Sequence, residues 1–299
     1  MIDSKLITLV TLSEKKSFTK TAEALSLTQP AVSHHIQQLE NELKAKLVIR
    51  NRNDVILTEE GRIAVDFAKK IIGIYSKMTS SVSDKEHHVT NLRIGITHTS
   101  ESNIMMTVLA KVSTLMENMN ITVITETIKK LYEMLDNYEI DMAILEDRAN
   151  PDRFNSLLLD TDSLVCILSK ENELAKKSAL TVEDLKKEKM ILRLPDSATR
   201  MQFESTLVSI NQSASDFNII LEVDNIDTIK TLVRQNLGIS ILARSACLDE
   251  IKKNKIVALP IENLSMIRET NIVYKKTFGY SNILDVIYST YQTVKKGNE

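Results

Sequence analysis

The sequence predicts an all-α winged helix-turn-helix domain, a long linker helix and a C-terminal α/β part made of two lobes. Three observations support this prediction. The first 60 residues consist of short helical patterns followed by a polar hairpin. An amphipathic pattern then continues to about residue 85, and from residue 91 short apolar runs alternate with helical stretches. Such alternation is typical of α/β domains with buried strands.

Length and composition are those of a soluble protein with several domains. The chain has 299 residues, of which 43% are hydrophobic and 26% are charged, and this length allows two or three domains. The net charge is −2, but basic side chains outnumber acidic ones in the first 90 residues and the reverse holds in the remainder. This weak asymmetry has the sign expected if the N-terminal part contacts DNA.

The sequence shows no targeting or metal-binding pattern. The N-terminus lacks the basic start and cleavage site of a signal peptide, and no apolar run is long enough to span a bilayer, so we expect a cytoplasmic protein. Cys166 and Cys247 lie in apolar runs, which predicts small buried hydrophobes rather than a redox pair. The spacing of Cys and His matches no metal site, and no cofactor is expected.

Short helices joined by a tight turn begin the chain. Apolar residues at helical spacing over residues 6–12 indicate a first helix. The second helix is expected at residues 19–25 and the third at residues 29–43. Thr28 is the expected N-cap of the third helix, and Pro30 lies in its first turn, where the missing N–H costs nothing.

The third helix has one apolar face and one unusual polar face. Val32, Ile36, Leu39 and Leu43 form one apolar stripe that is expected to face inward, and the small side chain of Ala22 lets the second and third helices cross closely. The opposite face carries neutral donor and acceptor side chains, whereas a merely solvated face would carry more Lys and Glu. Side chains of this kind read base edges in the major groove of DNA. Each of them alone would more often be inert, but together they predict DNA reading, and they are Gln29, Pro30, Ser33, His34, Gln37 and Gln38.

The next segment, KLVIRNRNDVILT, alternates around a polar tip and predicts a small hairpin or wing. Arg50 and Arg52 on this wing suit DNA phosphate or an adjacent minor groove. Thr58 is expected to cap a helix that runs to about Lys85. Its apolar positions recur close to a heptad spacing, which favours self-association over packing within its own domain. These positions are Ile63, Phe67, Ile71, Ile74, Met78 and Val82.

The α/β part contains ten apolar or β-branched runs, which are LRIGI, ITVIT, DMAIL, SLLLD, SLVCILS, MILRL, FNIILEV, GISIL, KIVAL and TNIVYKK. Helical stretches lie between many of them, such as residues 103–119 and 127–138, and a last helix closes the chain. About 200 residues of this pattern indicate two small α/β lobes rather than one sheet.

The N-terminal motif resembles the DNA-binding domain of LysR-type transcriptional regulators. The resemblance lies in SFTKTAEALSLTQPAVSHHIQQLENEL at residues 17–43, followed by LVIR at 47–50 and LTEEG at 57–61. It implies a homodimer or homotetramer with paired linker helices, bound to promoter DNA, with RNA polymerase as a candidate further partner. It also implies two Rossmann-like lobes, similar to periplasmic binding proteins, that hold a small effector in the cleft between them.

The resemblance implies domain boundaries as well. They are residues 1–58 for the winged helix-turn-helix, 59–88 for the linker helix, 91–162 with 267–299 for the first lobe and 163–266 for the second.

The resemblance assigns roles to single residues of the DNA-binding part. Gln29, Pro30, Ser33 and His34 would face the bases, and Thr28, Arg50 and Arg52 would hold the backbone or groove. The sequence departs from the family pattern at three positions. His34 stands where Arg is frequent, which makes one contact pH-dependent or removes it. Val48 and Lys44 stand where Phe and Gly are common, which changes local packing and a helix end.

An effector pocket is expected where strands end and helices begin, because ligands bind there in α/β lobes. Polar side chains occupy several such corners, among them residues 97–100 and 195–200. At the first corner, hydroxyl groups beside free helix N–H groups suit an anion, although a simple N-cap is the commoner role of each Ser or Thr. The mix of Arg200 with Glu146 and Asp224 leaves the charge of the effector open on the residues alone, and the resemblance favours a small carboxylate. The candidate residues are Thr97, His98, Thr99, Ser100, Thr127, Glu146, Ser197, Ala198, Thr199, Asp224 and Asn225.

Two other classes of protein explain the sequence less well. An enzyme would need a nucleophile, base or metal cluster, and neither a Gly-rich phosphate loop nor a nucleophile elbow is present. A solute-binding protein of a transporter would account for residues 91–299 but not for the first 90 residues. Salt-sensitive DNA binding separates that class from a transcriptional regulator.

Overall fold

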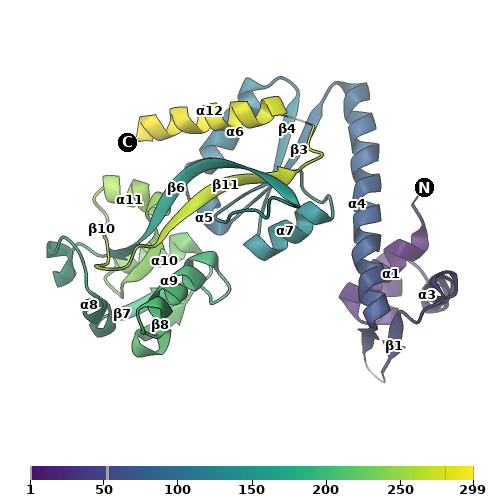
Figure 1. The fold of residues 1–299 in the computed structure, drawn as a ribbon, viewed down its shortest axis with the longest axis horizontal. Helices are drawn as coiled ribbons and strands as arrows, with labels where there is room; N and C mark the ends of the chain where they lie inside the picture. Colours follow the sequence, from purple (N-terminus) through teal and green to yellow (C-terminus); the bar gives the residue numbers. More distant parts are fainter. Residues whose placement is uncertain (1, 52–53, 280, 299) are drawn as a thin grey trace. The chain divides into compact units, whose positions relative to one another are not determined.

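The structure is a computed structural model that describes residues 2–51, 54–279 and 281–298. It divides into two compact units, Met1–Val89 with Asp136–Glu139, and Thr90–Leu135 with Ile140–Glu299 (Figure 1). Within the described ranges, every helix is too short or too polar to cross a lipid bilayer.

The N-terminal unit begins with a helix-turn-helix, as predicted. Its three short helices are α1 (Ser4–Lys15), α2 (Phe18–Leu25) and α3 (Gln29–Leu43). The turn after α2 places Ser26 in the left-handed region at φ 55°, a conformation that costs a side-chain-bearing residue energy and favours Gly. Ser26 therefore fills the role that Gly has in many such turns.

The predicted wing and long helix complete this unit. Strands β1 (Val48–Arg50) and β2 (Val55–Leu57) pair antiparallel, and α4 (Glu59–His87) follows. The Thr58 side chain caps α4 by accepting a hydrogen bond from the Gly61 N–H at 2.9 Å. The buried core joins α1, α3, α4 and the residue just before β1, and consists of Leu9, Leu12, Ile36, Leu39, Leu47 and Val65.

The first lobe of the second unit is a sheet covered by helices on both faces. Its parallel strands are β3 (Thr90–Ile96), β4 (Met119–Thr125) and β5 (Met142–Leu145). Helices α6 (Met105–Leu115) and α12 (Ser281–Asn298) pack on one face through one apolar cluster, and α7 (Ile128–Asp136) packs on the other through a second cluster (Figure 1). The helix predicted at residues 103–119 is shorter than expected, because β4 begins at Met119.

Two long strands connect the lobes. Strand β6 (Phe154–Leu168) pairs antiparallel with β11 (Ile267–Lys275), from Phe154 opposite Lys275 to Ser163 opposite Ile267 (Figure 1). The prediction of two separate strands at SLLLD and SLVCILS was wrong, since β6 runs through both. A register shift at Thr270/Asn271 absorbs one extra residue, so the pairing continues where a break was expected.

The second lobe has its own hydrophobic core, which lies within residues 164–266. Strands β7 (Lys189–Leu192) and β8 (Asn218–Glu222) pair parallel, and β9 (Ser240–Ala243) and β10 (Val257–Leu259) each pair with β6. Its helices are α8 (Val182–Lys187), α9 (Ala198–Ser209), α10 (Ile226–Arg234) and α11 (Leu248–Lys252). Two lobes are present as predicted, but seven strands of the described chain share one hydrogen-bonded sheet because β6 and β11 pass between the lobes.

Both cysteines are buried and free. Burial raises the pKa of Cys166 far above its ordinary value and the pKa of Cys247 to about 12. Since the thiolate is the reactive form, both thiols are packing groups in this structure.

Candidate functional site

Helix α3 packs against the core along one side, and its other side, called the free side below, faces solvent. Thr28 Oγ1 accepts a hydrogen bond from the Ala31 N–H at 3.4 Å, and Pro30 lies in the first turn, as predicted. Val32, Ile36 and Leu39 are buried as predicted, but the prediction was wrong for Leu43, which is 51% exposed in the last turn of the helix. The opposite side of the helix is therefore presented to solvent from its first turn onward.

The predicted base-reading side chains lie on that free side. Ser33 is half-buried next to the wing. Amide and hydroxyl groups have both the donors and the acceptors that a base edge can pair with, and this side of the helix presents them to solvent. The exposed members are Gln29, Pro30, His34, Gln37 and Gln38.

Arg50 connects the wing to both helices of the motif. Its Nη2 donates a hydrogen bond to Ser33 Oγ at 2.6 Å, and its guanidinium carbon lies 4.2 Å from the centre of the Phe18 ring. A guanidinium has five N–H donors, so donors remain for a phosphate after this contact. Arg52, the second predicted wing residue, lies outside the described residues.

Glu40 is a positioning residue that the sequence pattern did not reveal. Its carboxylate is buried and accepts hydrogen bonds from the Leu47 N–H at 2.9 Å and from Lys46 Nζ at 2.8 Å. Burial raises the pKa of Glu40, but the bonds from Lys46 and the backbone outweigh it and leave the pKa below its ordinary value. Glu40 thus fixes the wing to the end of α3.

Helix α4 carries an exposed apolar stripe. The predicted heptad positions are all between 47% and 67% exposed, although apolar side chains of this size are usually covered. They are Ile63, Phe67, Ile71, Ile74, Met78 and Val82.

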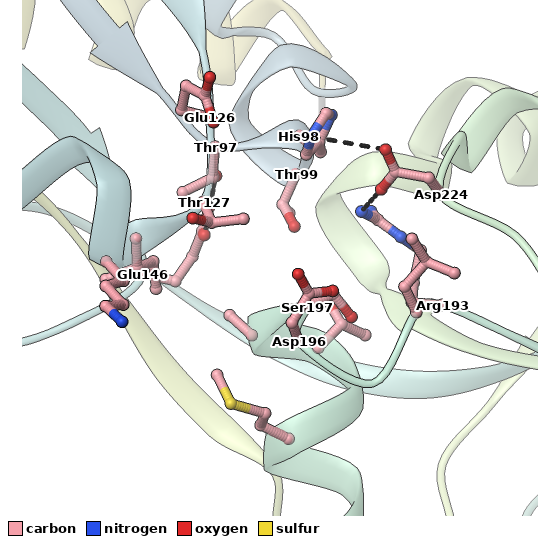
Figure 2. Close-up of a pocket in the computed structure, with 16 residues that line it drawn as sticks. Thr97, His98, Thr99, Glu126, Thr127, Glu146, Arg193, Asp196, Ser197 and Asp224 are labelled. Carbon is pink, nitrogen blue, oxygen red and sulfur yellow. Dashed lines mark hydrogen bonds and ion pairs between the residues drawn. The ribbon is translucent and has the colours of Figure 1, made fainter. Parts of the chain in front are cut away.

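The two lobes enclose a cavity of about 650 Å³ (Figure 2). Its polar residues follow the carboxyl ends of strands from both lobes, which is where α/β sheets bind ligands. The first lobe supplies residues after β3, β4 and β5, and the second supplies residues after β7 and β8. The volume falls in the range of small-molecule sites.

Glu146 forms the polar centre of the first-lobe wall. It is 9% exposed and follows β5. Thr97 Oγ1 donates to its two oxygens at 2.9 and 2.8 Å, and Ser100 Oγ donates to Oε1 at 3.0 Å. The carboxylate of Glu146 therefore accepts the hydrogen bonds of two hydroxyl groups at the corner that the sequence suggests for binding an anion.

Asp224 of the second lobe contacts a residue of each wall of the cavity. It accepts a hydrogen bond from Arg193 Nη2 at 2.8 Å, and His98 Nε2 of the first lobe lies 3.9 Å from its Oδ2 (Figure 2). Arg200, which the sequence had left as a possible ligand for the effector, does not line the cavity and pairs with Glu204 instead.

The structure brings most of the predicted effector residues to one cavity. Ser100 does not line it, because its fully buried side chain points to Glu146. Asn225 does not line it either, because its Oδ1 caps α10 by accepting from the Thr228 N–H at 2.9 Å. The predicted residues that do line it are Thr97, His98, Thr99, Thr127, Glu146, Ser197, Ala198, Thr199 and Asp224.

Several lining residues were not predicted. Glu126 and Arg193 each follow a strand directly, so the strand-end rule applied to every strand would have found them. Lys129 and Met201 lie inside α7 and α9, where only the turn of the helix shows which side chain faces the cavity. The remaining ones are Ile128 and Leu194, whereas Asp196, which also lines the cavity, belongs to the predicted corner at residues 195–200.

Comparisons with known proteins cover both units. The family model "LysR substrate binding domain" matches residues 85–282, and "Bacterial regulatory helix-turn-helix protein, lysR family" matches residues 4–62. A "Probable RuBisCO transcriptional regulator" of Trieres chinensis is 27% identical over 95% of this chain and 94% of its own.

Solved structures share the fold. Full-length CbnR complexed with its target DNA is 15% identical, with a TM-score of 0.66 over 98% of this chain and 99% of that chain. The Synechocystis PCC6803 CcmR regulatory domain in complex with 2-PG is 19% identical, with a TM-score of 0.60 over 69% of this chain and 98% of that chain.

Proposed function

Because the chain belongs to the LysR family of DNA-binding transcriptional regulators, we propose that it binds an operator as a homodimer under the control of a small effector. The observation that carries the proposal is the free side of α3. On the other side of this helix Val32, Ile36 and Leu39 are buried, whereas the neutral amide side chains of the free side are exposed, which is the pattern of a helix that enters a major groove.

The proposed DNA contacts fall into base contacts from α3 and backbone or groove contacts from its start and the wing. Gln29, Ser33 and Gln37 offer hydrogen-bonding groups to base edges, with Pro30 and His34 beside them. Thr28, at the helix start, and Arg50 are proposed to contact the sugar-phosphate backbone, and Arg52 stays a predicted contact to phosphate or an adjacent minor groove. Arg50 has a second role, since its bond to Ser33 sets the spacing between wing and helix before DNA arrives.

The exposed stripe of α4 supports the homodimer. Pairing two such helices would cover six apolar side chains that are otherwise in water. A two-fold dimer presents two copies of α3 to half-sites about 10 base pairs apart, or a multiple of that spacing. A dimer of dimers, and contact with RNA polymerase, are further parts of the proposal.

The cavity between the lobes is the proposed effector site. Its walls come from both lobes, and the lobes are connected by β6 and β11. A ligand that contacts both walls favours the closed arrangement of the lobes. In a tetramer, such closure would change the spacing between DNA-bound dimers.

Capture of sheared genomic DNA by the purified protein at physiological salt, followed by sequencing, tests this function. Gln29→Ala and Arg50→Ala are the test variants, and Gln235→Ala, an exposed glutamine of the effector part, is the control. We expect sharp peaks over an inverted repeat that the control retains and the test variants lose. Binding should also weaken steeply with salt. DNA capture that is absent at every salt concentration would favour the solute-binding alternative.

A further inference from the structure

We propose that the effector is an organic cation whose protonated amine is held by Glu146 in the cavity between the lobes. This inference rests on the proposed function, because it names the chemical class of ligand for that same site. The family resemblance favours a small carboxylate, which stays a prediction, whereas the charges of this cavity argue for the opposite sign.

The cavity carries an excess of negative charge. Among the described residues, four carboxylates and two permanently cationic side chains line it, which leaves a charge of −2 when His98 is neutral. One of the cations, Arg193, is already bound to Asp224 at 2.8 Å. The other, Lys129, is exposed, so solvent weakens its attraction for an anion. The four carboxylates belong to Glu126, Glu146, Asp196 and Asp224.

Glu146 is the carboxylate in most need of a cation. Its side chain is nine-tenths buried, yet no Lys, Arg or His within the described residues pairs with it. A buried charge without a counter-ion is costly unless a ligand supplies one. The hydroxyls of Thr97 and Ser100 satisfy part of its bonding capacity. A carboxylate offers about four lone-pair sites, so acceptor positions remain for an ammonium group.

The same hydroxyls are poorly suited to an anion. A hydroxyl has one proton to donate, and Thr97 and Ser100 both direct theirs to Glu146. An anion at this corner would therefore meet the carboxylate of Glu146 and two hydroxyl groups whose protons are already used. The Thr99 hydroxyl points into the cavity (Figure 2). An amine that donates one hydrogen bond to Glu146 can donate another to this hydroxyl oxygen.

Because carboxylates lie on both lobes, binding of an amine would also favour closure of the lobes. Glu126 and Glu146 belong to the first lobe, and Asp196 and Asp224 belong to the second. Like charges across the cavity resist approach of the two walls. A cation between them removes that repulsion, whereas an anion adds to it.

Calorimetric titration of the purified full chain tests the proposal with three probes of matched chain length, 1,4-diaminobutane, 4-aminobutanoate and succinate. We expect 1,4-diaminobutane to bind with a dissociation constant of about 1 mM or lower, 4-aminobutanoate to bind more weakly and succinate to give no heat of binding. Glu146→Gln should weaken diamine binding roughly tenfold or more, because it removes one charged hydrogen-bond partner.

Glu117→Gln is the matched control, since it makes the same change of charge at an exposed residue outside the cavity. Circular dichroism establishes that each variant is folded, and Glu126→Gln provides a second cavity variant that should also weaken the diamine. Succinate binding as tight as that of the diamine overturns the proposal. So does diamine binding that is undetectable, or that Glu146→Gln leaves unchanged in a folded protein.

A parallel DNA-binding assay without any probe separates the two proposals. Operator binding together with a failed diamine titration rejects the ligand class and leaves the regulatory function standing. Diamine binding without any DNA binding rejects the regulatory function and leaves the ligand class standing.

Discussion

Gly61 shows how one residue can determine the junction of two elements. A Cβ atom added there would lie 2.0 Å from the backbone oxygen of Leu47. That oxygen also accepts the Thr58 N–H at 3.0 Å, so it cannot move without loss of the helix start. The glycine in LTEEG is therefore explained by the close approach of α4 to the wing.

Gly61→Ala should destabilise the N-terminal unit by roughly 1–3 kcal/mol, because the added methyl group overlaps fixed backbone. Thermal unfolding followed by circular dichroism measures the effect. Gly297→Ala is the control, since a Cβ there meets nothing within 4 Å. Equal melting temperatures for Gly61→Ala and wild type would contradict the packing of α4 against Leu47.

At the scale of elements, the wing depends on side chains of its neighbours. It consists of two three-residue strands, which are marginal on their own. Glu40, near the end of α3, accepts hydrogen bonds from the backbone N–H groups of Leu47, just before the first strand, and Val48, at its start. Arg50 of the same strand contacts Ser33 of α3 and Phe18 of α2. These bonds cross between elements, so they keep the wing at a set distance from the base-reading side chains.

Glu40→Gln should lower the stability of the wing junction by about 1–2 kcal/mol at neutral pH, because a charged acceptor becomes a neutral one. The pKa of Glu40 is lowered by folding from 4.5. Its contribution is therefore present above about pH 4.5 and is lost as the pH falls through the lower folded value. Urea unfolding at several pH values should show wild type and variant converging in acid.

Glu23→Gln serves as the control for this series, because Glu23 is exposed on α2 and its removal should leave the unfolding midpoint unchanged. A difference between wild type and Glu40→Gln that stays constant down to the most acidic pH would show that the charge of Glu40 is not the stabilising feature.

At the scale of the whole molecule, the sequence predicted elements better than the contacts among them. The bounds of α3 matched the prediction because Thr28 and Pro30 mark its start locally. The continuity of β6 was missed, since its partner β11 is more than 100 residues away in the chain. The position of Ser100 could not be predicted for the same reason, because its partner Glu146 comes from another strand.

The apolar stripe of α4 leads to a prediction about assembly. Ile74→Asp should weaken the dimer roughly 100-fold or more, because it buries a charge in an apolar interface, and it should weaken operator binding in parallel. Sedimentation at several protein concentrations measures the first effect. Ser80→Asp, on the exposed opposite side of the same helix, should remain dimeric, and a dimeric Ile74→Asp variant would exclude this stripe as the interface.

The pairing of Ser163 with Ile267 has a consequence for how new sensors can arise. The chain leaves the first lobe and returns to it at one point of a single strand pair, so the second lobe is an insertion with adjacent ends. A recombination event with both crossovers at that point would exchange one whole wall of the cavity. The donor lobe would bring its own hydrophobic core, and the recipient would keep its DNA-binding unit. The two walls of the cavity, and with them the ligand specificity, can therefore change one at a time.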